Sequence, residues 1–174
     1  MRVLISDEYR DLNQRFHAEN KGFGTKAYKY AQAVARIALA SGAKSILDYG
    51  CGKGTLKVAL AEVLPSVRVE EYDPAVRGKD GDPKTEDMVI VFDVMEHVEP
   101  EHLDDVIQHI QSKARKTILF KISNVRARKQ LPDGRNAHLI VEDKQWWQTK
   151  IKQYCSVREI IDAGNECIIA CVIE

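Results

Sequence analysis

Residues 46–54 read Ile46-Leu47-Asp48-Tyr49-Gly50-Cys51-Gly52-Lys53-Gly54, and no other segment of the 174-residue chain constrains the architecture as strongly. The pattern predicts a short buried strand from Ser45 to Leu47, followed by the acid Asp48 and then by three glycines at alternate positions. Apolar side chains follow at helical spacing, at Leu56, Val58, Ala59, Leu60 and Val63. A strand, a glycine turn and a helix in this order bring the backbone of a doubly wound α/β domain close to a nucleotide-like ligand.

The glycines run G-x-G-x-G, which differs from the G-x-G-x-x-G fingerprint of dinucleotide-binding domains. This difference suits a ligand without a pyrophosphate, and Asp48 at the strand end can meet a cationic amino group. The segment resembles the first motif of class I S-adenosylmethionine-dependent methyltransferases, D-x-G-x-G-x-G. That motif is matched at Asp48, Gly50, Gly52 and Gly54.

Two further matches follow at the distances expected for this family. The segment Val67 to Pro74 reads as a second strand closed by Asp73, 19 residues after Gly54. An acid at that position can accept hydrogen bonds from both hydroxyls of a ribose. The strand pattern from Asp87 to Asp93 runs into Val94-Met95-Glu96-His97-Val98, which resembles the family's D-V-x-E-H segment. The resemblance spans roughly residues 28 to 174.

The fold is therefore predicted as α/β, with a doubly wound, mostly parallel Rossmann-like sheet, a C-terminal antiparallel hairpin and N-terminal helices. Residues 1–174 are expected to form a single class I methyltransferase-like domain, with 1–42 as an N-terminal helical cap region. Helices are predicted at 7–19 (with Ser6 as N-cap), about 26–40, from the glycine turn to Pro65, about 100–114, and around Trp146 to about 153. Strands are predicted at 45–47, 67–72, 88–93, 117–122, 156–162 and 166–173.

One region departs from the family pattern. Between Asp73 and Asp87 a full-length member has a helix, a third strand and another helix, whereas residues 74–86 here are rich in Gly, Pro and charge and have no apolar period. This segment is predicted to be a loop, and the missing strand would be an edge strand. The chain then resembles a compact member of the family, in which Asp80 and Asp82 are the only local acids for the adenine.

The composition is that of an ordinary globular protein, with 44% hydrophobic and 30% charged residues and no net charge. No apolar run approaches the roughly 20 residues that cross a bilayer, and the N-terminus lacks the apolar region of a secretory signal. The cysteines form no C-x-x-C pair and have no His at zinc spacing, so reduced thiols, no metal and a cytoplasmic location are expected. They are Cys51, Cys155, Cys167 and Cys171.

The resemblance implies S-adenosylmethionine as the cofactor. Asp48 and the glycine turn would hold its methionine end, and Asp73 would hold its ribose. The residues at the end of the 88–93 strand and directly after it would form one side of the site, because ligands bind at the carboxyl ends of strands in open α/β sheets. The cofactor-binding residues are predicted as Asp48, Tyr49, Gly50, Cys51, Gly52, Gly54, Tyr72, Asp73, Pro74, Asp93, Val94 and Met95.

Methyl transfer needs a nucleophile placed in line with the methyl group and, where required, a base that removes its proton. His97 is the first candidate for the base, because an unperturbed imidazole titrates close to neutrality, and His138 is the second. His97 can instead orient its loop or cap the following helix, and Glu96 can be a salt-bridged structural acid. Trp146 and Trp147 can stack on a substrate or pack their own helix.

Charges are segregated along the chain. Eight acids and no Lys or Arg lie between Glu86 and Asp105, whereas eight bases and one acid lie between Lys113 and Arg135. Two solvated faces would explain this pattern, and so would a basic loop that faces an anionic substrate. The substrate-binding residues are predicted as Arg126, Arg128, Asp133, Arg135 and Asn136.

The predicted function is methyl transfer from S-adenosylmethionine to oxygen or nitrogen of a small or extended, polar, anionic acceptor, either a small molecule or nucleotide-like. No N-P-P-Y or Pro-Cys motif follows the 88–93 strand, and there is no added target-recognition domain, so neither sequence-specific duplex DNA nor a membrane is an expected partner. One alternative is a protein of the same fold that binds or degrades the cofactor without transferring methyl. Another is a different nucleotide-binding α/β protein, such as an oxidoreductase. The acceptor and the oligomeric state stay open.

Overall fold

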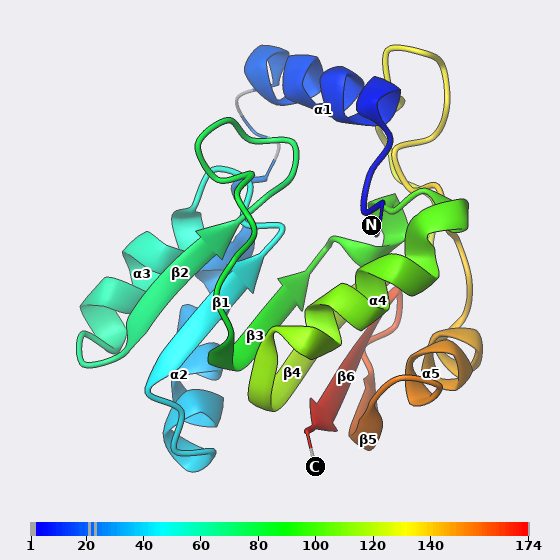
Figure 1. The fold of residues 1–174 in the computed structure, drawn as a ribbon. Coiled ribbons are helices and arrows are strands. Elements are labelled where there is room, and N and C mark those ends of the chain that lie inside the picture. Colours follow the sequence, from blue (N-terminus) through cyan, green and yellow to red (C-terminus); the bar gives the residue numbers. More distant parts are fainter. Residues whose placement is uncertain (1–2, 21, 23, 174) are drawn as a thin grey trace.

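A mixed sheet forms the centre of the molecule. The computed structural model describes residues 3–20, 22 and 24–173, and within these residues six strands pair in the order β2-β1-β3-β4-β6-β5 (Figure 1). The first four strands of the chain run parallel, and β6 is antiparallel to both β4 and β5. The strands are β1 (Ser45–Tyr49), β2 (Arg68–Tyr72), β3 (Glu86–Phe92), β4 (Ala114–Ser123), β5 (Ser156–Asp162) and β6 (Glu166–Val172). The prediction of a mostly parallel sheet that ends in an antiparallel hairpin is confirmed.

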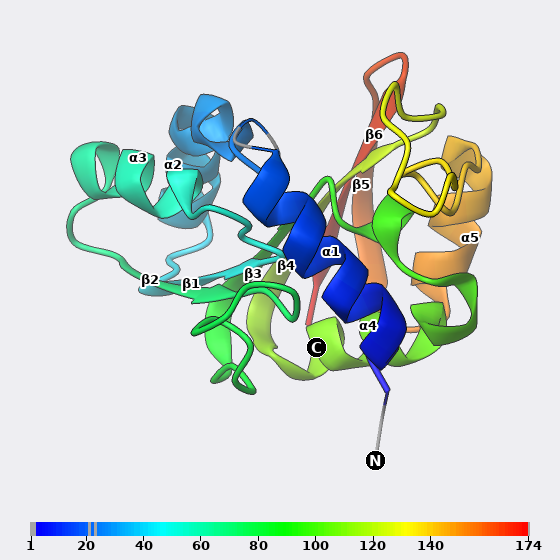
Figure 2. The same ribbon diagram turned by 90° about the horizontal axis from the view of Figure 1, so that it is seen from above.

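Helices cover both faces of this sheet, as Figure 2 shows from above. One face carries η1 (Ala27–Tyr30), α2 (Ala31–Ala40) and α3 (Thr55–Val63), and the other carries α4 (Leu103–Ser112) and α5 (Lys144–Lys152). Successive strand residues point to opposite faces, so neighbours in β1 and β3 enter different cores. Ile46, Met88 and Ile90 pack with α2 and α3, whereas Leu47, Val89 and Val91 pack with α4 and α5.

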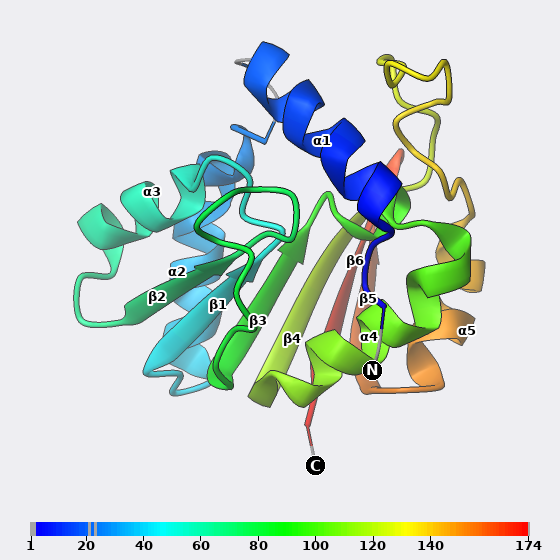
Figure 3. The ribbon, with the colours of Figure 1, turned by 45° about the horizontal axis from the view of Figure 1, so that its top comes forward.

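The helix α1 (Asp7–Glu19) lies across the carboxyl ends of the parallel strands (Figures 1 and 3). Ser6 caps it as predicted, because its hydroxyl accepts a hydrogen bond from the Tyr9 amide at 3.2 Å. The Ser6 amide and hydroxyl also donate to Glu99, at 2.8 and 2.6 Å. Tyr9 and Leu12 pack against Leu131 of the long loop after β4, so α1 and this loop form a small core of their own.

The predicted loop between Asp73 and Asp87 is confirmed, since no strand lies between β2 and β3 in these fully described residues and β2 is the edge strand. Two strands start earlier than predicted. β3 begins at Glu86 rather than Met88, because the buried Glu86 carboxylate binds Arg68 at 2.7 Å and Asp87 binds Arg115 at 2.9 Å. Paired in this way, charged residues can occupy strand positions that their polarity alone argues against.

β4 begins at Ala114 rather than Thr117. The helices predicted at 26–40 and 100–114 each start with a 3₁₀ turn, η1 and η3 (Pro100–His102). Between them the chain forms the short 3₁₀ turn η2 (Met95–His97) directly after β3. In the described part of the chain, no helix has both the length and the apolar content that crossing a membrane requires.

Candidate cofactor and acceptor site

The glycine turn after β1 has a backbone that only glycine adopts without strain. Gly50, Gly52 and Gly54 have φ angles of 77°, 51° and 74°. A Cβ atom on Gly50 would lie 2.3 Å from Cγ2 of Val94, and one on Gly52 would lie 3.0 Å from both Cα and the carbonyl oxygen of Gly24. The turn is therefore packed against two other segments, with its backbone exposed toward the space between them.

Asp73 at the end of β2 is joined directly to this turn. Its Oδ2 accepts a hydrogen bond from the Gly52 amide, and its Oδ1 accepts one from the Ala75 amide, both at 2.9 Å. The Gly50 amide donates to the Tyr72 carbonyl at 2.7 Å. The carboxylate is only 7% exposed and lines a cavity beside the turn, so its remaining acceptor positions face a potential ligand.

Asp48 is buried behind the glycine turn and does not line the cavity itself. Its Oδ2 atom is buried and has no hydrogen-bond partner among the described residues. Burial, helped by the neighbouring carboxylate of Glu71 and opposed by the charge of Lys79, raises the pKa of Asp48 to about 7. A cation near the turn would favour the ionised form.

The cavity next to the turn has a volume of about 120 Å³. Its floor is formed by Gly50, Gly52 and Asp73, together with Pro74 and Ala75. Its roof includes Tyr9, Asn13 and His17 of α1. Ligand sites are usually some 300–1,000 Å³. The helix α1 therefore limits the space beside the turn.

A second, larger cleft of about 530 Å³ adjoins this cavity. Gly24, Gly50 and Asp93 line both spaces, so they mark the junction. Asp93 has a φ of 55°, which is uncommon for a residue other than glycine and occurs at functional sites when neighbouring groups hold it in place.

The neighbour that holds Asp93 is Lys121 on β4. The Lys121 Nζ lies 2.5 Å from Oδ1 of Asp93 and 2.8 Å from Oε1 of Glu166, although the residue is only 2% exposed. Burial lowers the pKa of Lys121, but these two carboxylates raise it more, so the net shift is upward and the ammonium stays charged. This buried cation was not recognised from the sequence, where Lys121 was one base within a basic run.

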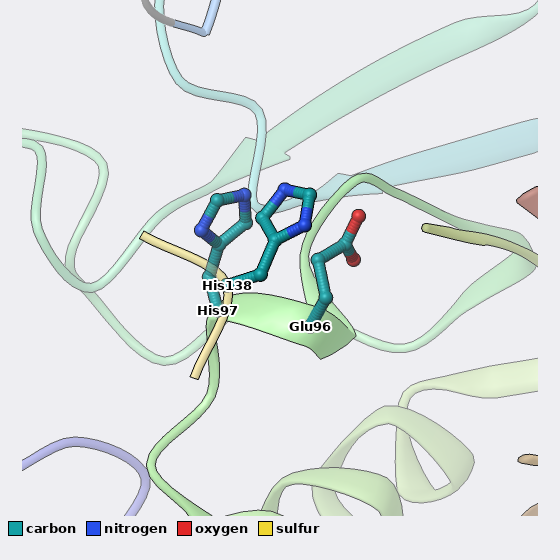
Figure 4. A group of neighbouring side chains, drawn as sticks. All are labelled: Glu96, His97 and His138. Atoms are coloured by element: carbon teal, nitrogen blue, oxygen red, sulfur yellow. The ribbon is translucent and has the colours of Figure 1, made fainter. Parts of the chain in front are cut away.

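The two candidate bases, His97 and His138, lie side by side at this junction. Their ring centroids are 4.8 Å apart, and the side chains of both project with Glu96 into the same space (Figure 4). Burial lowers the pKa of His97, so that its imidazole is neutral near pH 7. Burial, together with the nearby carboxylate of Asp93, raises the pKa of Glu96 to about 7. The structure thus brings together two residues that are 41 positions apart in the sequence.

Several of the residues predicted to bind the substrate make contacts with other side chains or backbone groups of the protein. Arg135 pairs with Asp133 at 2.7 Å and lies over the ring of Tyr9. Asn136 holds Ala127 through two hydrogen bonds, of 2.9 and 2.8 Å.

A third cleft, of about 650 Å³, is lined by Arg126, Arg135 and Asn136, together with Trp146 and Lys150. It shares His138 with the 530 Å³ cleft. Arg128 lines none of these cavities.

Several predicted cofactor residues have side chains away from the cavity. Met95 is fully buried, and it and Tyr72 belong to the main core, so neither side chain lines the 120 Å³ cavity. Gly54 lies against Glu71 and Lys79 behind the turn.

The two acids considered for the adenine make other contacts. Asp82 binds His109 at 3.0 Å and Lys113 at 2.7 Å, and Asp80 accepts a hydrogen bond from the Gly78 amide within its own loop. Neither acid lines the 120 Å³ cavity. In contrast, Tyr49, Pro74, Asp93 and Val94 line the 120 Å³ cavity and Cys51 lines the 530 Å³ cleft.

The methyltransferase-domain family matches residues 23–160, and the chain belongs to this family. The prediction of a class I S-adenosylmethionine-dependent methyltransferase is confirmed at the level of the family. The fold agrees with that of 1,6-didemethyltoxoflavin-N1-methyltransferase from Burkholderia thailandensis, solved with its substrate and S-adenosylhomocysteine. The TM-score is 0.67 at 13% identity, over 99% of this chain and 92% of that one.

Two further solved structures share the fold. Magnesium protoporphyrin IX methyltransferase from Synechocystis PCC 6803, with bound SAH, gives a TM-score of 0.57 at 20% identity, over 84% of this chain and 83% of its own. An O-methyltransferase family protein from Burkholderia thailandensis gives 0.58 at 12% identity over 86% of this chain. This chain spans 58% of that protein and 56% of a related structure from Nostoc punctiforme. A search of curated proteins gave no significant match.

Proposed function

We propose that this chain transfers a methyl group from S-adenosylmethionine to an oxygen or nitrogen of a small or extended, polar, anionic acceptor. The observation that carries the proposal is the junction at Asp93. There the cavity formed by the glycine turn and Asp73 opens into a cleft that contains His138, with His97 at the boundary. A cofactor site beside an acceptor cleft is the arrangement that direct group transfer requires.

The residues around the 120 Å³ cavity fit this cofactor. The backbone of Gly50 and Gly52 lines the cavity and can approach a ligand closely, and Asp73 has acceptor positions for ribose hydroxyls. The unpartnered Oδ2 of Asp48 lies behind the turn, where the cationic amino group of the methionine end would favour the ionised carboxylate. When bound, S-adenosylmethionine supplies a methyl group that its sulfonium already activates.

The chain's own contribution to the reaction is positioning and proton removal. His97 and His138 each direct Nδ1 to a backbone carbonyl, at 2.6 Å from Ala137 and 2.6 Å from Val125 respectively. A carbonyl can only accept, so each Nδ1 carries the hydrogen and each Nε2 carries the lone pair. Either Nε2 can take a proton from an acceptor hydroxyl or amine that enters the cleft.

The anionic character of the acceptor is supported by Lys129 in the 530 Å³ cleft and by Arg126 and Arg135 in the neighbouring cleft. Guanidinium groups suit carboxylates and phosphates because they offer two parallel donors. We propose that residues 1–42 act as the cap of a single domain, since Tyr9, Asn13 and His17 roof the cavity.

The test has two stages. Calorimetry with S-adenosylmethionine, S-adenosylhomocysteine and NAD should show binding of the first two only, and NAD binding in their place would refute the assignment. The protein should then be incubated with S-adenosylmethionine and a panel of hydroxy acids, phenols, amines, nucleotides and sugar phosphates. Formation of S-adenosylhomocysteine together with a methylated acceptor, detected by mass spectrometry, supports transfer. Binding followed by cofactor breakdown without any methylated product would indicate a cofactor-degrading enzyme instead.

A further inference from the structure

Glu96, His97 and His138 form a cluster with the composition of a metal site. Each offers one ligand atom, and these three atoms all lie within 4.8 Å of one another. Glu96 and His97 come from the turn η2, and His138 comes from the long loop after β4 (Figure 4). Two imidazoles and one carboxylate are a common ligand set for divalent transition metals, and they leave further coordination positions open.

Both imidazoles are oriented as metal-binding histidines are. Metal ligands of this type usually donate their other ring N–H to a carbonyl or carboxylate, which fixes the tautomer and the direction of the ring. Here the Nδ1 atoms of His97 and His138 lie 2.6 Å from the carbonyl oxygens of Ala137 and Val125. The two Nε2 atoms are therefore the ones that carry lone pairs toward the cluster.

Glu96 supplies the second, independent observation. The residue is 0% exposed, and its Oε1 accepts a hydrogen bond from the Ser123 amide at 3.0 Å. Its Oε2 is buried without a hydrogen-bond partner among the described residues. A buried carboxylate oxygen without a partner is costly, and a cation is the partner that would satisfy it best.

The nearest buried ammonium does not fill this role. Lys121 directs its Nζ to Asp93 and Glu166 instead, at 2.5 and 2.8 Å.

We propose that Glu96, His97 and His138 bind one divalent transition-metal cation, such as Mn²⁺, Co²⁺ or Zn²⁺, at the junction of the two cavities. Bonds of about 2.1 Å allow two ligands to be at most about 4.2 Å apart, so binding draws the side chains slightly closer. The role of the ion rests on the proposed methyl transfer. It would coordinate an oxygen of the acceptor and lower the pKa of that hydroxyl, as bound metals do for water.

This role defines the acceptor more closely. An ion with open positions favours a hydroxyl that has a second oxygen donor beside it, such as a hydroxy acid or a vicinal diol, because such a pair can chelate. The histidines would then hold the ion rather than accept the proton, so the hydroxyl proton would pass to solvent water in the cleft, the acceptor oxygen would form the bond to the methyl carbon, and the bond from that carbon to the sulfonium would break to release S-adenosylhomocysteine. Activity that depends on added metal would distinguish this mechanism from direct proton removal by a histidine.

The metal site is tested by titrating untagged, chelator-treated protein with MnCl₂, CoCl₂, ZnCl₂ and MgCl₂ in a calorimeter, and by the visible spectrum of the Co²⁺ form. We expect one site per chain for a transition metal, and at least a tenfold weaker site in Glu96→Gln and in His138→Ala. His102→Ala is the matched control, because His102 lies in η3 outside the cluster, and it should bind as the unmodified protein does.

S-adenosylmethionine binding by each variant, measured without metal, reports whether the fold and the cofactor site are intact. Cofactor binding without any transition-metal binding would overturn the metal site alone and leave the proposed function standing. Metal binding that His138→Ala and Glu96→Gln leave unchanged would place the ion elsewhere and also overturn the inference. Metal binding without cofactor binding would refute the proposed function and leave the site standing.

Discussion

The backbone amide of Gly52 donates a hydrogen bond to Oδ2 of Asp73 at 2.9 Å, so two motifs that are 21 residues apart form one unit. Asp73 also fixes the start of its own loop through the Ala75 amide, at 2.9 Å. The acid expected to bind a ribose therefore has a second role, because it holds the glycine turn in place before any ligand arrives.

Asp73→Ala is expected to weaken S-adenosylmethionine binding by about 1–3 kcal/mol, the usual cost of losing hydrogen bonds to a charged group. Because the same change releases the Gly52 amide, binding of methionine alone should also weaken, though by less. Calorimetry with both ligands measures the two effects. Asp80→Ala removes an acid of the same loop whose side chain accepts a hydrogen bond from the Gly78 amide, and it should change neither affinity. Equal losses for both ligands would show that Asp73 acts on the turn and not on the ribose.

Asp48→Asn is expected to change the pH dependence of stability. The pKa of Asp48 is raised from 3.8 to about 7 in the folded protein, so the native state holds a proton that the unfolded chain releases. The free energy of unfolding of the wild type should thus fall between pH 4 and 7, by a few kcal/mol at most, and Asn should remove that fall.

Urea denaturation of the wild type and of Asp48→Asn from pH 4 to pH 8 measures this difference. The variant should gain stability relative to the wild type as the pH rises, while its affinity for S-adenosylmethionine is lost. Asp80→Asn, on the exposed loop between β2 and β3, is the control and should follow the wild type. A constant difference across the pH range would mean that Asp48 is ionised throughout.

Lys121→Met should destabilise the protein by about 1–3 kcal/mol, because it leaves Asp93 and Glu166 without their shared cation. Both carboxylates are partly exposed, so the loss is smaller than for a fully buried pair. Lys144→Met removes a more exposed pair with Asp162 and should cost less than 1 kcal/mol. Chemical denaturation compares them, and equal stabilities for the two variants would contradict the structural role of Lys121.

Replacing Arg126, Arg128, Lys129 and Arg135 together by Ala should raise the Michaelis constant of an anionic acceptor and leave S-adenosylmethionine affinity nearly unchanged. Arg126 and Arg135 line the 650 Å³ cleft and Lys129 lines the 530 Å³ cleft, so single replacements can show which cleft receives the acceptor. Arg128 lines neither and serves as the internal control. Unchanged turnover in the quadruple variant would show that these basic residues form a solvated surface and do not bind the acceptor.

Much of the fold could be predicted because its signals are local. The three glycines, the alternating apolar residues of β1 and β3, and the capping Ser6 each determine their own segment without help from distant residues. The loop between Asp73 and Asp87 could be predicted equally well, since its Gly, Pro and charged residues offer no apolar face. The early start of β3 could not be predicted, because Arg68 and Arg115, which pair with its first two residues, come from other strands.

The site was harder to predict because its contacts are long-range. Nothing near Lys121 in sequence reveals that Asp93 and Glu166 converge on it, and nothing near His17 shows that α1 covers the cavity. Gly24 had a local signal, the pair Gly22 and Gly24 before η1, but its contact with Gly52 exists only in the folded chain. The contact between the rings of His97 and His138 could not be predicted from the sequence either, although each residue was a candidate base on its own.

Calorimetric titration of S-adenosylmethionine into Gly52→Val tests the central claim, that the glycine turn holds the cofactor. A Cβ at Gly52 meets Gly24 at 3.0 Å on a backbone with a φ of 51°, whereas Gly81 has open space around it and Gly81→Val is the matched control. We predict that folded Gly52→Val loses measurable binding and that Gly81→Val binds as the wild type does. Undiminished affinity in a folded Gly52→Val protein would contradict the assignment of the site.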